Sequence, residues 1–567
     1  MFFAGMLTAS SLPIFCNNIY YGHDIDFHMN RIVSIAKELS YGHFPVRIHS
    51  DMLNGYGYAT SLFYGDTMLY IPALLYMAKV PLGQCWQLYI LINNALTIIF
   101  SYACFKEMVK KEKYALVGVF LYVLAPYRLI NIYTRAAVGE FTAMTFFPLV
   151  ALGFWNIYTK EAAKLRDYLP AAIGLSGVVQ SHVISTEMAA IFIGMACIVN
   201  LRRTIKPGIL WCLTKTAVLT ALLSAWFLVP MLDSMSMDIN VTGRMGRIQE
   251  QGLYPVQLAS LFFSGVGKSL KNTTQEEMGF SLGPALCIGI VLALCVYADY
   301  KMKRIHNVLE KGVAICLGMG IIALLFASRI FPWDTLACRS NAVAKYLCMI
   351  QYPWRYLAIA TLMISIASAG ALSILRESLG TTKVKAIVCA MVLLCMISTG
   401  YYYYHFTYES NMLTVVSETD CNQFYIGDEE YLLKGTETEL LQIRNVKHAA
   451  NVEVAELKRT EGNYTYICQN KSEMEQEILL PILNYEHYVV KDIEKGVIFD
   501  IENGENNCMA VLLPPQYEGE ITVLYQERMI WRLCEAISLM TVAALAIMGM
   551  RKFKRIRLKG RHLHEKA

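Results

Sequence analysis

Long apolar runs recur along the whole chain and constrain its fold more than any other feature. A helix needs about 20 apolar residues to cross the hydrocarbon core of a bilayer. Only 17% of the residues are charged and 55% are hydrophobic, whereas ordinary soluble domains carry about 25% charged residues. The sequence therefore predicts a polytopic α-helical membrane protein with about 12 transmembrane helices. The expected spans lie near 2–19, 85–105, 114–131, 139–158, 168–182, 184–201, 209–230, 278–300, 312–330, 352–376, 384–404 and 529–550.

Basic residues gather in the connections between these runs, and their placement predicts the topology. The basic segments lie at 106–113, 159–167, 201–206, 301–311, 376–385 and 551–562. All of them fall on one side if the short apolar stretch 67–80 does not span the membrane, and the positive-inside rule makes that side cytoplasmic. We therefore expect both termini in the cytoplasm and the stretch 67–80 in the membrane interface.

Three long polar regions then face the outside, at about 20–84, 231–277 and 405–527. The third contains alternating runs bounded by Gly, Asn and Pro, a pattern typical of half-buried strands. These runs lie at 451–457, 464–468, 496–502, 508–513 and 520–525. We predict three domains: a transmembrane domain over 1–404, an extracytoplasmic β-sandwich-like domain over 405–527, and a final transmembrane helix with a basic cytoplasmic tail over 528–567.

Charge and cysteine content exclude several functions. The net charge is +5 over 567 residues, and the basic residues form short clusters rather than one patch, so we expect no nucleic-acid partner. Most of the 16 cysteines lie in apolar runs, where a free thiol behaves as a small hydrophobe. The third polar region holds Cys421, Cys468 and Cys508, an odd number without metal-type spacing, so neither a disulfide framework nor a zinc site is expected.

The first polar region opens with two acids, in "DIDFHMNRIVSIAKELS" (24–40). Its apolar residues recur at helical spacing, which predicts a helix lying on the outer surface of the bilayer. Asp24 suits the N-cap position, and Asp24, His28 and Arg31 share one face, whereas Asp26 points elsewhere with Asn30. From spacing alone, the two acids are either a general base or metal site, or a helix cap beside a solvated acid.

The following stretch, "GHFPVRIHSDMLNGYGYATSLFYGD" (42–66), is rich in Gly, Tyr and His. Its aromatic residues suit a membrane interface or a sugar-binding surface, so Tyr56, Tyr64 and Asp66 are candidate substrate-binding residues. The histidines of the first polar region have no tight ligand spacing, and we expect no histidine metal site. These histidines are His23, His28, His43 and His49.

Charged residues also flank predicted spans on the outer side. Arg128, Arg135, Arg355 and Glu140 could bind a lipid phosphate or could act as interfacial anchors, and Trp354 beside Arg355 presents the same alternatives. A further acidic cluster lies in "YIGDEEYLL" (425–433), and we interpret it as a solvated turn. Its acids are Asp428, Glu429 and Glu430.

Several motifs together carry a resemblance to a known superfamily. An acidic pair just after the first span, followed by an interfacial helix and many further spans, resembles the GT-C superfamily of membrane glycosyltransferases. Four motifs, "GHDIDFH…R" (22–31), "GHFPVRI…NGYGY…FYGD…LYIPALL" (42–75), "QYPWRYL" (351–357) and "GDEEYL" (427–432), resemble a bacterial family of GT-C-like membrane proteins. That family includes the YfhO-type proteins and those called "6-pyruvoyl-tetrahydropterin synthase related". The resemblance covers nearly the whole chain.

The resemblance implies a GT-C-like fold and a function in the bacterial cell membrane. It implies transfer of a sugar from a polyprenyl-phosphate-linked donor to a cell-envelope glycan or glycolipid acceptor at the outer leaflet. Asp24 matches the motif aspartate and would act as the general base, with His28 orienting it or binding sugar hydroxyls. A divalent cation, Mg²⁺ or Mn²⁺, at Asp24 and Asp26 is also compatible with the superfamily.

The resemblance also implies a site for the leaving phosphate. Arg355, together with Arg128 or Arg135, would stabilise the departing polyprenyl phosphate. The substrate-binding set expected around the general base is Asp26, Arg31, Tyr56, Tyr64, Asp66, Arg128, Arg135, Glu140, Trp354 and Arg355.

Two other classes of function stay open from the sequence. The first is a lipid or glycan flippase or transporter, although the predicted spans are almost free of charge at mid-depth and Lys215 lies near the end of its span, which argues against coupled transport. The second is a non-catalytic membrane protein whose outer domain binds an envelope partner, because a fold alone does not define a function.

Overall fold

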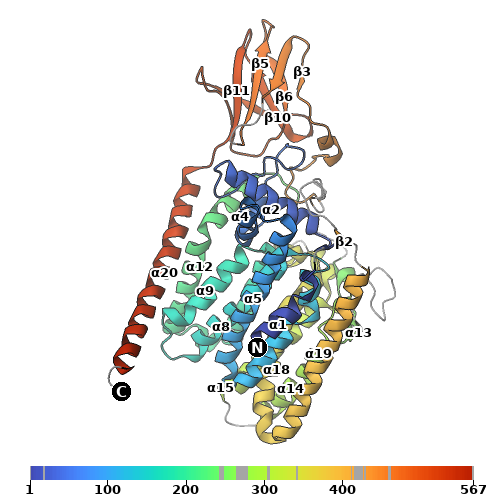
Figure 1. The fold of residues 1–567 in the computed structure, drawn as a ribbon, viewed down its shortest axis with the longest axis vertical. Helices are drawn as coiled ribbons and strands as arrows, with labels where there is room; N and C mark the ends of the chain where they lie inside the picture. Colours follow the sequence, from blue (N-terminus) through green and yellow to red (C-terminus); the bar gives the residue numbers. More distant parts are fainter. Residues whose placement is uncertain are drawn as a thin grey trace. The chain divides into compact units, whose positions relative to one another are not determined.

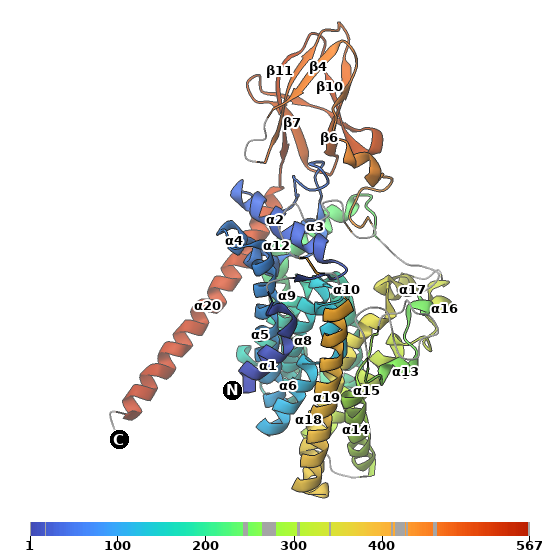
Figure 2. The same cartoon turned by 45° about the vertical axis from the view of Figure 1, so that its right-hand side comes forward.

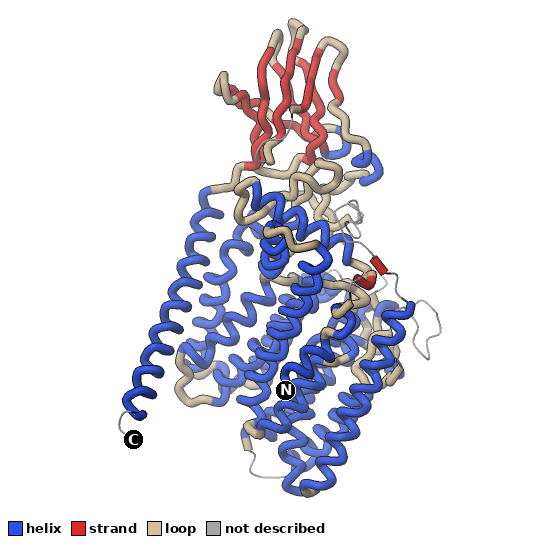
Figure 3. Tube along the Cα trace, viewed as in Figure 1, coloured by secondary structure: helices blue, strands red, loops and turns tan. Residues whose placement is uncertain are grey.

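The computed structural model describes residues 2–16, 19–241, 248–262, 279–302, 307–339, 342–413 apart from 410 and 411, 426, 429–457 and 462–564. The chain forms two compact units. The first, here called the helical unit, comprises Met1–Cys212 and Ile239–Arg444. The second, here called the β unit, comprises Leu213–Asp238 and Asn445–Ala567. Figure 3 colours the helices blue and the strands red.

Eight helices in the described part of the chain are long and apolar enough to cross a membrane, and a ninth span arises if the bent pair α6 and α7 is counted as one. This composition makes the chain a multi-pass membrane protein. Figure 1 labels all eight long helices. They are α5 (Leu82–Val109), α8 (Val138–Thr159), α12 (Pro207–Asp233), α14 (Pro284–Met302), α15 (Val308–Ala327), α18 (Leu357–Leu379), α19 (Thr381–Glu409) and α20 (Met529–His564).

The predicted count of about 12 spans is therefore not confirmed, because three predicted spans form shorter helices. α1 (Phe2–Ser10) has 9 residues, α9 (Leu165–Val179) has 15 and α10 (Val183–Val199) has 17. At about 1.5 Å per residue, none of them reaches the roughly 30 Å of a hydrocarbon core. α1 ends ahead of Pro13, which lies in the short turn η1 (Leu12–Ile14).

The bent pair consists of α6 (Glu112–Val123) and α7 (Pro126–Ile132), which meet at 46°. Pro126 occupies the first turn of α7, and Ala125 before it has extended backbone angles, φ −61° and ψ 136°. A proline favours this break, because it lacks a backbone N–H and disfavours helical angles in the preceding residue. The bend turns the chain just before the polar segment that holds Arg135.

The predicted helix over 24–40 is present as α2 (Ile25–Ser40), but its surroundings differ from the prediction. We expected a helix lying on the bilayer surface with one apolar stripe, whereas nearly all of its residues are buried in the helical unit. The following stretch folds back over it: Arg31 donates to the carbonyl of Tyr64 (3.0 Å), and the Ser50 N–H donates to Glu38 (2.8 Å). The apolar stretch 67–80 forms α4 (Tyr70–Met77), which packs against α2.

The basic connections meet at one end of the helical unit. Lys160 after α8 lies 3.5 Å from Glu107 of α5, and Lys111 lies 3.1 Å from Glu377 of α18. The Tyr158 hydroxyl lies 2.7 Å from that of Thr204, which joins the connection after α10 to the same end. We call this the basic end. α8 has 22 residues, so its first turn lies about 30 Å away, at the end called here the site end.

The β unit contains two antiparallel sheets that share one apolar core, as predicted for a β-sandwich. One sheet has the order β3-β6-β10-β9 and the other β4-β5-β11-β7-β8. Both sheets contribute to the core, for example Leu480 from β6 and Tyr466 from β5. Figure 2 shows the strands. They are β3 (Lys447–His448), β4 (Val452–Glu456), β5 (Tyr464–Asn470), β6 (Gln476–Leu483), β7 (Tyr488–Asp492), β8 (Val497–Phe499), β9 (Ile501–Asn503), β10 (Cys508–Leu513) and β11 (Glu518–Tyr525).

Residues 429–444 belong to the helical unit rather than to the β unit, so the boundary lies later than the one expected at 405. The first polar region holds this segment through side chains. The Tyr58 hydroxyl donates to the carbonyl of Glu430 (2.5 Å) and the Tyr56 hydroxyl to that of Ile443 (2.8 Å). Tyr56, expected to bind substrate, therefore anchors the chain on its way out of the helical unit.

Candidate functional site

Asp24 occupies the N-cap position of α2, but its side chain makes no capping hydrogen bond. The backbone fixes its place instead: the N–H groups of His23 and Asp24 donate to the carbonyls of Thr134 (2.9 Å) and Arg135 (3.0 Å). The half-buried carboxylate lies close enough to Tyr64 and Arg135 to interact electrostatically with both. Asp24 is thus a carboxylate held at the site end whose side chain does not serve as a helix cap.

His28 and Arg31 lie one turn further along α2 and are both buried. Arg31 Nη1 lies 3.5 Å from His28 Nδ1, and its guanidinium stacks 4.5 Å from the centre of the Tyr64 ring. Burial and the positive charge of Arg31 lower the pKa of His28 well below its ordinary value, so the imidazole is neutral. His28 and Arg31 pack against the Tyr64 ring, and the neutral His28 does not exchange protons near neutral pH.

Tyr64 connects α2 to the first turn of α8. Its hydroxyl accepts the N–H of Gly139 (3.0 Å), and a Cβ atom at Gly139 would collide with that ring. Burial raises the pKa of Tyr64 to about 12, so the phenol stays protonated and can donate its own hydrogen. The His182 ring, between α9 and α10, lies 6.2 Å from the Tyr64 ring. His182 was not among the residues selected from the sequence.

Glu140, in the first turn of α8, contacts two arginines that were also candidates from the sequence. Arg135 Nη1 donates to Glu140 Oε2 (2.6 Å), and Arg355 Nε lies 3.7 Å from the same oxygen. Tyr127 and Asn131 of α7 donate to Oε1. All five side chains are buried. We call Tyr127, Asn131, Arg135, Glu140 and Arg355 the Glu140 cluster. Through Arg135 it lies within electrostatic reach of Asp24.

The Glu140 cluster extends to Glu430, which was interpreted from the sequence as part of a solvated turn. Arg355 Nη1 donates to Gln351 Oε1 (2.7 Å), and Gln351 Nε2 donates to Glu430 Oε1 (2.9 Å). Tyr431 next to it lies 6.4 Å from the Tyr64 ring. The acidic stretch interpreted as a solvated turn thus contributes to the site end through Glu430, while Asp428 lies outside the described residues. The sequence contained one indication of this role, because "GDEEYL" (427–432) is among the motifs that resemble the GT-C-like family.

Trp354 lies in a stack of aromatic rings beside Arg355. Its ring centre is 4.3 Å from that of Tyr352 and 4.9 Å from that of Phe280. Within the described residues, the Trp354 Nε1–H and the Arg355 Nε–H have no hydrogen-bond acceptor, although both atoms are buried. Within the same residues the Nε atoms of Arg31 and Arg128 also lack an acceptor, so a donor of this kind does not by itself mark a ligand site.

Arg128 does not join the Glu140 cluster. Its Nη2 donates to Asn94 Oδ1 (2.8 Å) and Thr97 Oγ1 (2.9 Å) of α5, and its Nη1 to the carbonyl of Val123 (3.3 Å). Asn94 in turn donates to the carbonyl of Ser10 at the end of α1 (3.0 Å). We call Arg128, Asn94 and Thr97 the Arg128 cluster. It joins α1, α5 and α7 and is completely buried.

Asp66 lies in a buried chain of hydrogen bonds within the first polar region. Ser61 donates to Asp66 Oδ2 (2.6 Å), His49 Nε2 lies 2.7 Å from the Ser61 hydroxyl, and His49 Nδ1 lies 2.8 Å from the Ser34 hydroxyl. Burial lowers the pKa of His49 to about 3, so the ring is neutral and the chain requires the Nε2–H tautomer with Ser34 donating to Nδ1. Asp66 thus fixes the polar loop that carries Tyr64.

The described residues do not supply the donor set of a metal site. No group of three or more His, Cys, Asp or Glu side chains within them could hold a metal ion. Asp26 accepts a hydrogen bond from the Tyr21 hydroxyl (3.1 Å). Asp24 and Asp26 are two carboxylates, which Mg²⁺ can use only when waters and substrate phosphates supply the remaining oxygens, and within the described residues no third His, Cys, Asp or Glu completes a group with them. We therefore derive no step through a metal.

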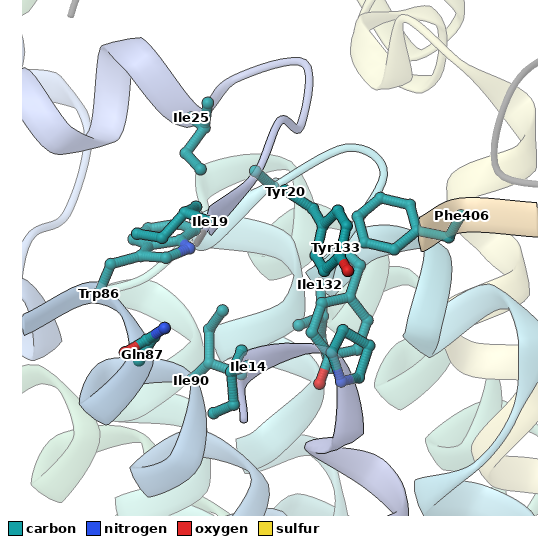
Figure 4. A pocket seen from close by; sticks show the side chains of 12 residues that line it. Ile14, Ile19, Tyr20, Ile25, Trp86, Gln87, Ile90, Ile132, Tyr133 and Phe406 are labelled. Carbon is teal, nitrogen blue, oxygen red and sulfur yellow. The ribbon is translucent and has the colours of Figure 1, made fainter. Parts of the chain in front are cut away.

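A small cavity lies beside Ile25, between the first polar region, α5 and α7. Figure 4 shows Ile25, Trp86 and Tyr133 around it. Its volume is about 20 Å³, enough for about one water molecule and too small for a sugar or a lipid chain. This cavity is therefore not a site for such a substrate.

Fold and site together define a multi-pass membrane protein with a buried ionic cluster beside one acid. No family model matches the chain. A relative from Lactococcus lactis subsp. cremoris, an uncharacterized protein, is 23% identical over 334 residues, which are 57% of this chain and 52% of the relative. The chain thus spans about half the length of that relative.

Solved membrane enzymes align with low structural similarity. The mycobacterial arabinofuranosyltransferase AftD aligns at 15% identity and a TM-score of 0.39, over 73% of this chain and 27% of AftD. The Archaeoglobus fulgidus oligosaccharyltransferase aligns at 13% identity and 0.40, over 71% and 53%. ArnT from Cupriavidus metallidurans aligns at 10% identity and 0.31, over 66% and 78%. TM-scores of this size do not establish a common fold, so function must be argued from the residues of this chain.

Proposed function

We propose that the protein is a membrane glycosyltransferase that moves a sugar from a polyprenyl-phosphate-linked donor to a cell-envelope glycan or glycolipid at the outer leaflet. The motif resemblance supports this class of reaction. The observation that carries the proposal is the placement of Asp24: a carboxylate that does not cap its helix lies within electrostatic reach of Arg135, and Arg135 is paired with Glu140, which also faces Arg355.

In this reaction Asp24 is the general base. Its carboxylate takes the proton of an acceptor hydroxyl while the acceptor oxygen forms a bond to the anomeric carbon of the donor sugar. The bond from that carbon to the phosphate oxygen breaks, and the configuration at the carbon inverts. The sugar is thereby transferred, and the polyprenyl phosphate leaves with an additional negative charge.

Arg355 stabilises the leaving phosphate in this proposal. Its Nε–H makes no hydrogen bond within the described residues but lies 3.7 Å from Glu140 Oε2, so the phosphate would share this guanidinium with Glu140. Trp354 beside it offers its indole N–H, and a phosphate accepts both kinds of donor strongly. Glu140 and Gln351 hold the guanidinium in place before substrate arrives, as electrostatic catalysis requires. Tyr64 would donate to a sugar hydroxyl, and His28 and Arg31 act as positioning residues beneath it.

The test is mass spectrometry of cell-wall polymers and glycolipids from cells with and without the gene. We expect one sugar to be absent without the gene and restored by the wild-type protein. Asp24→Asn, made at normal membrane levels, should not restore it, whereas Glu429→Gln, which changes an exposed acid of the same unit, should. Full restoration by Asp24→Asn would overturn the assignment of the base. An unchanged envelope without the gene would favour the flippase or envelope-binding alternative.

A further inference from the structure

A second cavity, unrelated to the site end, lies inside the helical unit. It has a volume of about 460 Å³ and is bounded by α8, α10, α14, α15 and α18. An engineered protein cavity of about 150 Å³ already binds benzene, so this space exceeds a packing defect and suits a ligand. Its middle is apolar, with Phe154, Ile193 and Met363 among its walls.

The two ends of this cavity differ in chemistry. Towards the basic end it is lined by Arg203 and Lys311, with Asn200 and Asn307 beside them. Arg203 is exposed and Lys311 is half-buried. Within the described residues neither side chain belongs to an ion pair, unlike Lys160 and Lys111 nearby, which face carboxylates. The cavity thus combines an apolar interior with a positively charged mouth.

The length of the cavity corresponds to one leaflet of a bilayer. Along α8 its wall runs from Phe147 to Thr159, which is about 18 Å at 1.5 Å per residue. Along α15 it runs from Val308 to Met319. Half of a hydrocarbon core is about 15 Å thick. A molecule with an anionic head at the basic end and one acyl chain pointing towards the membrane centre matches both the charge and the depth.

We infer that this cavity binds one anionic glycerophospholipid from the leaflet that meets the basic end, with its phosphate between Arg203 and Lys311 and an acyl chain among the apolar walls. This site lies at the other end of α8 from Asp24 and the Glu140 cluster, and it does not depend on the proposed function. A zwitterionic lipid of the same chain length lacks the net charge that the two basic residues select.

Trp155 lines the cavity and provides a direct probe. We would place the full-length protein in phosphatidylcholine nanodiscs and titrate phosphatidylglycerol brominated on its acyl chain, reading the quenching of tryptophan fluorescence. The expected result is a saturable component at low mole fraction that disappears in Trp155→Phe. Brominated phosphatidylcholine should not produce this component.

Variants that remove the charges of Arg203 and Lys311 test whether the cavity selects an anionic lipid. The double variant Arg203→Gln and Lys311→Gln should shift the titration midpoint about tenfold or more, because each basic residue near an anionic lipid contributes about 1 kcal/mol. The matched control, Arg202→Gln with Lys301→Gln, removes two exposed charges near the same connections and should leave the midpoint unchanged. In Ala196→Trp the larger side chain fills part of the cavity, and this variant should lose the saturable quenching by the brominated lipid.

Three outcomes would overturn the inference. The first is an equal midpoint for the wild type and the Arg203 and Lys311 double variant. The second is equal saturable quenching by the zwitterionic lipid. The third is displacement of the bromolipid by polyprenyl phosphate but not by unlabelled phosphatidylglycerol, which would assign the cavity to an isoprenoid chain.

Discussion

Two buried arginine clusters in the helical unit differ in what surrounds the guanidinium groups. In the Arg128 cluster one arginine binds amide, hydroxyl and carbonyl oxygens, and within the described residues its contacts are all uncharged. In the Glu140 cluster two arginines share one carboxylate. Within the same described part, the Nε atoms of Arg128 and Arg355 both lack a hydrogen-bond partner, so unsatisfied donors do not separate the clusters. The first arrangement joins helices through neutral oxygens, whereas the second sets two positive charges against one negative charge and so keeps a net positive charge that an anion can balance.

The difference between the two clusters gives a criterion for separating structural from functional arginines in a membrane protein. Both kinds are buried and both lie near the ends of apolar helices, so burial does not distinguish them. What distinguishes them is the charge of the groups that they contact, which are neutral oxygens around Arg128 and a shared carboxylate between Arg135 and Arg355. A second difference is that an acid outside the cluster, here Asp24, lies within electrostatic reach of Arg135. On this basis we assign Arg128 to the packing of α1, α5 and α7.

The largest expected effect on stability comes from Glu140→Gln. Removing the carboxylate leaves Arg135 and Arg355 buried beside each other without their common counter-charge, and breaking a buried pair costs about 3–5 kcal/mol. Thermal unfolding in detergent, followed by tryptophan fluorescence, should show a large fall in Tm. Glu429→Gln is the control, and an equal Tm for the two variants would contradict the role of Glu140.

Arg355→Met should act on transfer more than on folding. Loss of one preorganised donor to a developing charge typically lowers a rate about 10²–10³-fold. The measurement is the amount of the transferred sugar per folded protein in cells, with Arg329→Met as the control because Arg329 binds Gly252 and Tyr254 away from Glu140. A loss of less than about threefold would remove Arg355 from the proposed phosphate site.

Arg128→Met should cost less stability than Glu140→Gln. The change leaves the acceptor oxygens of Asn94 and Thr97 without donors, which costs about 1–3 kcal/mol, but it also removes a buried charge. The same unfolding measurement tests this order. A larger loss for Arg128→Met than for Glu140→Gln would reverse the comparison.

Mild acid should destabilise the region around Tyr64 and spare the Arg128 cluster, which holds no group that titrates near neutral pH. The pKa of His49 is lowered to about 3 by burial, against about 6.5 in an unfolded chain. Between these values the unfolded state binds more protons, so stability falls as pH decreases. From pH 7 to 5.5 the loss for this residue is about 1 kcal/mol. Unfolding of wild type and His49→Asn at both values measures it, and an equal loss in both would contradict the assignment.

Much of this structure could be predicted from sequence periodicity, and much of the site could not. The apolar runs indicated α5, α8, α14 and α15, and the alternating runs indicated β4, β5, β10 and β11, because local hydrophobic spacing determines which surfaces are buried. The predicted count of spans is not confirmed where helix length, rather than hydrophobicity, decides, because α9 and α10 are apolar but short.

The site depends on contacts between distant segments, which spacing within one segment does not reveal. Arg135 and Glu140 are five residues apart, which is not the spacing of a helical ion pair, and Arg355 joins them from a distant segment. Glu430 contacts the cluster through Gln351. Arg128 and Arg135 are the same residue type near the same span end, and their different partners become visible in the fold. Residue types near span ends therefore predicted candidates, while the fold determined which of them meet.

The most direct test of the central claim compares Asp24→Asn with Arg128→Met in cells that lack the gene, measuring the transferred sugar by mass spectrometry and dividing it by the amount of folded protein. If Asp24 is the general base, Asp24→Asn lowers this ratio by about 10² or more, because the base is lost. Arg128→Met should leave the ratio close to that of the wild type. A wild-type ratio for Asp24→Asn would contradict the assignment of Asp24 as the base.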